Sequence, residues 1–262
     1  MPEGDTLWRT AAALRPRILE HTVRRAWPPP LARLAGRRVL AVDAAGKHLL
    51  MRFEGDLTLH SHMRMTGSWH VYAPGQRWRK PERAARAVLE FDDVVAVLFS
   101  APVVELVRDV ASRIGHLGPD ILAEDFDPVA AVRQARLSDR LEVGDLLLDQ
   151  RVCAGIGNIY KCETMWIHDV NPWTPTAAIP DDALAQLYAT ARRLMLESAH
   201  GSMGRRRRAV HARSGRPCPR CGTAIATRGQ GVLNRVTYYC PTCQGRPTRA
   251  AAARIEVVEK HA

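Results

Sequence analysis

Pro2 and Glu3 are the residues whose types and spacing most directly suggest chemistry. If Met1 is removed, Pro2 becomes the chain terminus and its ring nitrogen is a free secondary amine. An α-amino group has a reference pKa of about 7.7–8.0, so part of the population is unprotonated near neutrality. Such an amine attacks an electrophilic carbon and gives an iminium cation, which is a strong electron sink. Glu3 lies within covalent reach of the same centre and can move protons. The alternative is that Met-Pro is simply a common way for a chain to begin.

Four cysteines follow the pattern C-x2-C-x18-C-x2-C: Cys218, Cys221, Cys240 and Cys243. Two such pairs brought together by a β-hairpin present four thiolates tetrahedrally, which suits one structural zinc ion. Gly229-Gln230-Gly231 predicts the turn of this hairpin and residues 236–239 predict a strand. Two disulfides are disfavoured in a cytosolic chain. Cys153 and Cys162 lack this spacing and are expected to be core thiols.

The positive charge of the chain is concentrated in its last quarter. The net charge is +11, and residues 201–262 contain 13 Lys and Arg against only Glu256 and Glu259. A basic module on a neutral body predicts a polyanionic partner, with nucleic acid as the leading candidate. The alternative is a solubilising tail that includes the run Arg205-Arg206-Arg207-Arg208. No stretch is apolar enough for a membrane span and no signal peptide is visible, so a cytoplasmic protein is expected.

The elements that position these residues change in type along the chain. A helix is expected from Asp5 or Thr6, either of which can cap it, with apolar residues recurring on one face. Short alternating segments with close turns then predict a β-sandwich. Its strands are expected at 38–43, 48–53, 57–62, 67–72, 86–91, 94–99 and 103–108. Beyond Gly118 the pattern is helical, and helices are expected at 128–136 (capped by Asp127), 140–149 and 181–199. The fold class is therefore two-domain α+β.

Three connections carry further candidate residues. Lys47 stands in a turn between two strands, where most lysines are simply solvated. Met65, in the segment from His62 to Gly67, could fill a gap left in stacked bases or pack against the sandwich. Gly155-Ile156-Gly157-Asn158 leaves backbone N–H groups at the start of a helix, an arrangement that suits phosphate. The alternative for Gly155 is a helix C-cap in an αα-hairpin.

Together these motifs resemble the formamidopyrimidine-DNA glycosylase/endonuclease VIII family over Met1 to about Cys243. The resemblance rests on four motifs in the same order: Pro2-Glu3-Gly4, Gly46-Lys47, Gly155-Ile156-Gly157-Asn158 and the four cysteines. It implies a β-sandwich followed by a helical helix–two-turn–helix domain with a zinc finger. The implied domains are 1–125 (catalytic sandwich with its leading helix), 126–200 (helical DNA-binding domain), 201–243 (basic linker and finger) and 244–262 (a tail without an assigned role).

The resemblance also implies roles for matched residues. Pro2 is similar to the nucleophile that attacks C1′ of the damaged nucleotide, and Glu3 to the general acid/base. Lys47 is similar to the residue that supports base release and β-elimination. Arg235 resembles the arginine that grips the phosphate at the flipped nucleotide and assists δ-elimination, as suits a bidentate guanidinium. The implied DNA contacts are Asn158, Gly157, Arg64 and Met65.

The branch of the family is indicated by the segment at the end of the sandwich. Val107-Arg108-Asp109 stands where purine-type members carry Arg-Arg-Phe, which favours the endonuclease VIII branch and oxidised pyrimidines. The chain departs from the family at Asp5-Thr6, where many members have Pro-Glu, and at Thr66, which has no ring for stacking. The predicted function is a monomeric bifunctional DNA glycosylase/AP lyase of base excision repair that acts on damaged DNA. The alternatives are an oxidised-purine glycosylase, a non-catalytic damaged-DNA-binding protein and an RNA-binding zinc-ribbon protein.

Overall fold

The chain forms two compact units, which meet at Leu117 and Gly118. The computed structural model describes residues 2–201 and 208–245, so the predictions for most of the arginine run and for the tail from 246 onward lie outside the described residues. The boundary predicted from the sequence was residue 125. The units divide before residue 125 for a local reason: Ile121 N–H donates to the Ala154 carbonyl (3.0 Å) and Gly118 N–H donates to the Gln150 carbonyl (2.9 Å). These bonds join residues 118–121 to the second unit.

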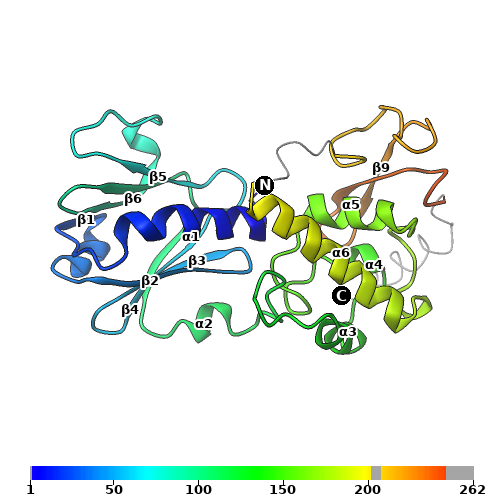
Figure 1. The fold of residues 1–262 in the computed structure, drawn as a ribbon, viewed down its shortest axis with the longest axis horizontal. Coiled ribbons are helices and arrows are strands. Elements are labelled where there is room, and N and C mark those ends of the chain that lie inside the picture. The colour runs from blue at the N-terminus through cyan, green and yellow to red at the C-terminus, as the bar shows by residue number, and fades with distance from the viewer. Residues whose placement is uncertain (1, 202–207, 246–262) are drawn as a thin grey trace. The chain divides into compact units, whose positions relative to one another are not determined.

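Unit 1, residues 2–117, is a sandwich of two four-stranded antiparallel sheets, ordered β1-β6-β7-β5 and β2-β3-β4-β8 (Figure 1). The strands are β1 (Arg25–Trp27), β2 (Val39–Ala45), β3 (His48–Phe53), β4 (Leu57–His62), β5 (Ser68–Tyr72), β6 (Ala85–Glu90), β7 (Val95–Phe99) and β8 (Val103–Val107). Two short 3₁₀ helices connect strands, η1 (Pro29–Leu34) between β1 and β2 and η2 (Glu82–Ala84) between β5 and β6, and the short helix α2 (Ala111–Ile114) follows β8. All seven predicted strands are present. The eighth, β1, is only three residues long and offers no alternation to detect.

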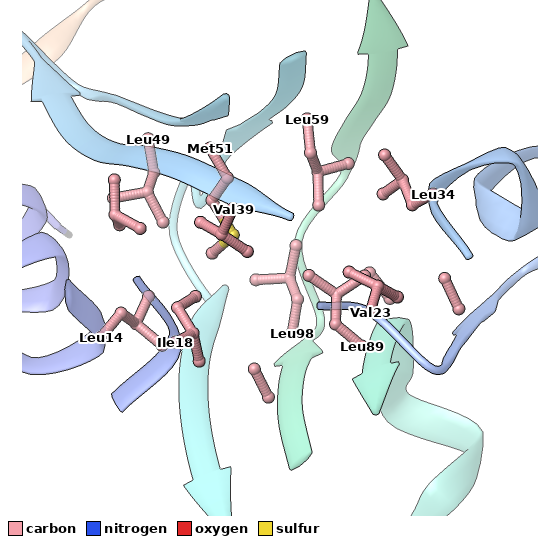
Figure 2. Close-up of a cluster of buried hydrophobic side chains, with 14 of the residues drawn as sticks. Leu14, Ile18, Val23, Leu34, Val39, Leu49, Met51, Leu59, Leu89 and Leu98 are labelled. Carbon is pink, nitrogen blue, oxygen red and sulfur yellow. The ribbon is translucent and has the colours of Figure 1, made fainter. Parts of the chain in front are cut away.

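The core of unit 1 lies between the two sheets and extends to the leading helix α1 (Gly4–Ile18). Figure 2 shows Leu14 and Ile18 of α1 facing Leu49 of β3, with Leu98 of β7 among them. Each of these four side chains is at most 2% exposed. Burying an aliphatic side chain of this size contributes about 1.5–3 kcal/mol, so the apolar stripe fixes α1 against the sandwich.

The helix α1 begins one residue earlier than predicted, and neither Asp5 nor Thr6 caps it. Glu3 occupies the N-cap position, and its carbonyl accepts from Thr6 N–H (2.9 Å) and Leu7 N–H (3.2 Å). Asp5 lies inside the first turn, where its carboxylate pairs with Arg9 (3.2 Å). A carboxylate in the first turn favours the helix because it faces the positive end of the macrodipole.

The described residues of unit 2, 118–201 and 208–245, form helices and one β-hairpin (Figure 1). Its elements are α3 (Pro128–Arg136), α4 (Val143–Leu146), α5 (Asn158–Ile167), η3 (Thr176–Ala178), α6 (Asp181–Ala199), β9 (Ala226–Gln230) and β10 (Arg235–Tyr239). The prediction for α3 is confirmed, including its cap, since the Asp127 carboxylate accepts from Val129 N–H (2.8 Å) and Ala130 N–H (3.0 Å). The long helix α6 also has the predicted bounds, and it packs against α3 and α5.

Two local predictions in unit 2 are wrong. The helix expected at 140–149 is confined to α4, because Glu142 pairs with Pro175 in a β-bridge and Val143 N–H donates to the Thr174 carbonyl (3.0 Å). These contacts hold the start of the segment extended. The hairpin turn lies at 231–234 and not at 229–231, because Gln230 is buried as the last residue of β9.

Candidate functional site

The N-terminal pair stands at the start of α1. Glu3 is 1% exposed and Pro2 is half-buried. The helix lies along the sheet because the Arg15 guanidinium donates twice to the Val42 carbonyl of β2 (2.7 and 3.2 Å). The first turn of α1 and the β2–β3 turn lie at the same end of unit 1 (Figure 1). Sequence order and packing therefore carry Pro2 and Glu3 to the end of the sandwich that also bears Lys47.

Lys47 occupies the second position of a two-residue hairpin turn. Ala45 pairs with His48 across the turn, and Gly46 has φ +55°, a left-handed conformation that glycine adopts without strain. Lys47 itself is half-buried. Its backbone is therefore fixed by a tight turn, which limits where its ammonium group can reach.

The β4–β5 turn presents Arg64 and Met65 at the surface. Met65 is 66% exposed, whereas Met63 two residues earlier is 2% exposed and belongs to the core. The turn is so tight that a Cβ on Gly67 would lie 2.6 Å from the Met63 carbonyl oxygen. Thr66 Oγ1 donates to the Ser100 carbonyl (3.0 Å), which fixes the other side. The turn therefore presents Met65 on a rigid support.

Three histidines beside these turns were not predicted from the sequence. His48, His60 and His62 lie on one face of β3 and β4, with His48 Nδ1 2.7 Å from His60 Nε2 and the His48 and His62 rings 4.8 Å apart. Burial lowers the pKa of His48 to about 3, assisted by the neighbouring histidines. Burial, Arg64 and Lys47 lower the pKa of His62 to about 4. Both rings are therefore neutral near pH 7. The detectable signal was the spacing His60-x-His62 opposite His48 in a hairpin.

In unit 2 the predicted DNA contacts Asn158 and Arg235 lie on adjacent elements. The Asn158 side-chain amide donates to the Val236 carbonyl of β10 (2.9 Å), so it attaches the hairpin to α5. Its Oδ1 atom is buried and has no hydrogen-bond partner among residues 2–201 and 208–245. Arg235 is half-buried at the start of β10, and within the described parts of the chain no carboxylate pairs with its guanidinium. Its charge is thus available to an anion.

Gly155 and Gly157, the two glycines that precede α5, have separate roles. Gly155 has φ +107°, and a Cβ there would lie 3.0 Å from Ile121 Cγ2, so only glycine fits without strain. It does not cap a helix, because α4 already ends at Leu146. Gly157 is buried at the N-cap position of α5 and provides no side-chain cap. The alternative of a C-cap at Gly155 is therefore wrong.

A buried lysine fixes the hairpin to α5, and no motif or spacing in the sequence indicated it. Lys161 has no exposed surface, and its Nζ donates to Thr237 Oγ1 (2.6 Å) and approaches Gln230 Oε1 (3.4 Å). Gln230 in turn donates to Glu142 Oε2 (3.0 Å) and to the Pro172 carbonyl (2.7 Å). Buried charges are retained in proteins when they are hydrogen-bonded in this way.

The four cysteines form a site of the size that zinc requires. Their sulfur atoms all lie within 4.8 Å of one another, and Cys221 Sγ is 3.4 Å from Cys240 Sγ and 3.5 Å from Cys243 Sγ. A tetrahedron with Zn–S bonds of about 2.3 Å has sulfur atoms about 3.8 Å apart. The residues therefore fit one structural zinc ion. Arg220, between the first two cysteines, packs its guanidinium 4.5 Å from the Trp166 ring of α5 and pairs with Asp169.

A β-sandwich with a buried N-terminal acid, a helical unit and a four-cysteine hairpin define a class of two-unit zinc proteins. The sequence matches three family profiles in chain order: the formamidopyrimidine-DNA glycosylase N-terminal domain (residues 1–102), the formamidopyrimidine-DNA glycosylase H2TH domain (117–207) and the zinc finger found in FPG and IleRS (215–245). The chain belongs to the formamidopyrimidine-DNA glycosylase/endonuclease VIII family. The resemblance noted from the motifs is thus confirmed.

Relatives extend over nearly the whole chain. A protein named probable endonuclease 8 2 from Streptomyces coelicolor is 42% identical, covering 98% of this chain and 99% of its own. The DNA-(apurinic or apyrimidinic site) lyase Nei2 from Mycolicibacterium smegmatis is 37% identical, and the match covers 93% of this chain and 99% of that protein. The crystal structure of MutM (Fpg) from Thermus thermophilus is 30% identical with a TM-score of 0.77, covering 94% and 100%. The endonuclease 8 names support the predicted branch. None of the helices in the described residues is long and apolar enough to cross a membrane.

Proposed function

We propose that this protein is a bifunctional DNA glycosylase and AP lyase of base excision repair. The observation that carries the proposal is the N-terminal pair, an imino acid followed by a buried carboxylate at the start of α1, in a chain that belongs to this family. The names of its relatives, which include an endonuclease 8 and an apurinic or apyrimidinic site lyase, support the same activity. Oxidised pyrimidines are the proposed substrates, because the chain lacks the Arg-Arg-Phe motif after the sandwich.

In the proposed reaction the Pro2 nitrogen, free once Met1 is removed, attacks C1′ of the damaged nucleotide. The bond from C1′ to the base breaks, the base leaves with a proton supplied by Glu3, and the sugar ring opens to an iminium. The iminium acidifies the C2′ hydrogen, whose loss expels the 3′ phosphate as β-elimination. Hydrolysis of the iminium then regenerates the Pro2 amine. The target nucleotide must leave the base stack before C1′ is reachable.

The remaining predicted residues have supporting roles in this proposal. Lys47 assists base release and β-elimination from its constrained turn. Arg235 binds the phosphate of the flipped nucleotide as a fork of two N–H donors and assists δ-elimination. Asn158 and Gly157 contact the backbone, while Arg64 and Met65 enter the gap left in the duplex. The zinc site of the four cysteines holds the finger that carries Arg235, and zinc supplies rigidity there and not reaction chemistry.

Borohydride trapping tests the proposal. Reduction of the iminium on duplex DNA that contains an oxidised pyrimidine should give a covalent adduct, and mass spectrometry should locate it at Pro2. Pro2→Gly should weaken or abolish the adduct, whereas Arg17→Met, an exposed change near the end of α1, should retain it. If the wild-type protein forms no adduct on any oxidised base or abasic site, the enzymatic proposal fails. Non-catalytic binding of damaged DNA would then be the remaining function.

A second experiment separates the steps. Arg235→Ala should spare base release and reduce δ-elimination, so the nicked product should retain its sugar fragment; unaltered product ends would contradict the assigned role. We also propose that the protein acts as a monomer in the cytoplasm, bound to DNA. Multi-angle light scattering of the free protein and of its DNA complex should show one protein chain in each.

A further inference from the structure

A basic segment, Arg77–Lys80, is held against the face of the β1-β6-β7-β5 sheet that is turned away from the main core. Trp78 stacks on Tyr72 (ring centres 6.2 Å apart) and meets Phe99 edge-on (5.7 Å). The Lys80 ammonium lies 5.9 Å from the centre of the Phe99 ring. These rings belong to an apolar cluster separate from the main core. The aromatic contacts therefore fix where the cations of the segment stand.

Four side chains and one backbone amide form a continuous chain of hydrogen bonds there. Arg79 N–H donates to the Tyr72 hydroxyl (3.1 Å), which lies 3.1 Å from His70 Nδ1. His70 Nε2 lies 3.0 Å from Ser68 Oγ, which also accepts from Lys80 Nζ (2.8 Å). Ser68, His70 and Tyr72 alternate along β5, so all three point to this face of the sheet.

The direction of this chain follows from the burial of Tyr72. Tyr72 is 3% exposed and its oxygen already accepts from Arg79, so its hydrogen needs an acceptor, and His70 Nδ1 is the one in reach among the described residues. His70 is neutral, because burial lowers its pKa and the charges of Lys80 and Arg79 lower it further. With Nδ1 accepting, the ring proton sits on Nε2 and donates to Ser68. The reverse direction would bury the Tyr72 hydrogen without an acceptor.

The series of hydrogen bonds from Tyr72 to Lys80 therefore ends in donors that are not used within the cluster. Ser68 Oγ accepts two hydrogen bonds, so its own hydrogen is left to donate to a group outside the cluster, and the Lys80 ammonium has further N–H groups. No carboxylate in the described parts of the chain pairs with Arg77, Arg79 or Lys80. Outward donors beside unpaired cations favour an oxyanion. A serine nucleophile is excluded, because His70 Nε2 already carries a proton and cannot accept another.

The position of the cluster indicates which oxyanion it takes. Ser68 directly follows Gly67, which closes the turn that bears Arg64 and Met65, so Ser68 lies within about 10 Å of Met65 along the chain. We propose that Ser68 and Lys80 bind a backbone phosphate of the DNA next to this turn, with Arg77 and Arg79 beside it. This inference rests on the proposed function, since it needs DNA at the turn.

Binding measured against salt concentration tests the inference. The probe is a duplex with a tetrahydrofuran abasic-site analogue, and binding is followed by fluorescence anisotropy across a series of KCl concentrations. Each neutralised phosphate contributes about −0.9 to the slope of log K against log salt, so Lys80→Met should make the slope shallower by about 1. Lys80→Arg keeps the charge and should keep the slope. Ser68→Ala should weaken binding about tenfold without changing the slope, because it removes one hydrogen bond to a charged group.

Arg17→Met is the matched control, because it removes one exposed positive charge near the far end of α1 and should leave the slope unchanged. Circular dichroism verifies the fold of each variant, and Ser68→Ala carries the test if Lys80→Met does not fold. If Lys80→Met keeps the wild-type slope of log K against log salt and Ser68→Ala keeps the wild-type affinity, this inference is overturned and the proposed function is not. Loss of borohydride trapping and of binding in the wild type would instead overturn the proposed function. A Lys80-dependent thermal shift with inorganic phosphate, without any change in DNA binding, would show a free-phosphate site and would also overturn the assignment.

Discussion

The histidines beside Lys47 should make unit 1 less stable in mild acid. His48 and His62 have pKa values of about 3 and about 4 in the folded protein, against an ordinary value of about 6.5 in the unfolded chain. Both pKa values are lowered by folding, so the unfolded state binds protons first as the pH falls. The free energy of unfolding should therefore be constant above about pH 7.5, decline from about pH 6.5 downward, and level off below about pH 3.

The size of the effect follows from the two shifts. At pH 5 a histidine with an unfolded pKa of about 6.5 and a folded pKa of 3 or 4 disfavours folding by about 2 kcal/mol. Both rings are half-buried, so solvent screens part of each penalty, and we take about 1 kcal/mol for each ring. Unit 1 should then lose about 2 kcal/mol from these two histidines between pH 7.5 and pH 5.

Urea unfolding of the wild type and of His48→Asn at the two pH values measures this loss. Trp8, Trp27, Trp69 and Trp78 lie in unit 1 and two further tryptophans lie in unit 2, so fluorescence reports mainly on unit 1. His48→Asn should reduce the loss by about 1 kcal/mol. It also removes the contact with His60, but that cost is the same at both pH values and cancels in the difference.

A matched control is Arg86→Gln, an exposed residue of β6 that does not titrate in this range. It should show the wild-type pH dependence. Equal losses in the wild type and in His48→Asn would refute the reasoning, because the burial of His48 would then not oppose its protonation.

Three further predictions concern other features. Gly155→Ala should destabilise unit 2 by about 2 kcal/mol, because the alanine would combine a left-handed backbone with contact to Ile121. The control Gly215→Ala meets no atom within 4 Å and should cost less free energy of unfolding in urea. Equal costs in the two variants would refute the packing argument. Cys221→Ser should lower the zinc content measured by atomic absorption and speed zinc release to a chelator; retention of one tightly held zinc per chain would exclude Cys221 as a ligand. Met65→Ala should change the free energy of unfolding by less than about 0.5 kcal/mol, because the side chain is exposed, and yet weaken binding to abasic-site duplex. Unchanged affinity in that variant would exclude Met65 from the DNA interface.

The sequence predicted the elements that have a strong local signal. Alternating apolar residues located the seven longer strands, the Asp127 cap located α3, and the cysteine spacing located the zinc site. The wrong predictions occurred where tertiary contacts override local preference. The β-bridge of Glu142 shortens α4, and the burial of Gln230 shifts the hairpin turn. Neither contact leaves a periodic trace in the sequence.

The candidate site shows the same limit. Pro2, Glu3 and Lys47 were predicted from motifs, but the histidine cluster depends on strand register, since His48 pairs opposite His62 only once β3 and β4 have folded together. Lys161 was overlooked because a lysine is normally placed at the surface. Its burial requires partners from residues 230 and 237, which lie far along the chain.

Lys161 also decides how separable the finger is. Gln230 and Thr237 of the hairpin are buried against the Lys161 ammonium, so a finger moved to another scaffold would leave these polar side chains without that partner. A chimaera that exchanges residues 215–245 with those of a relative would have to exchange the matching positions on α5 as well. The finger and the α5 positions that it covers must therefore be exchanged together.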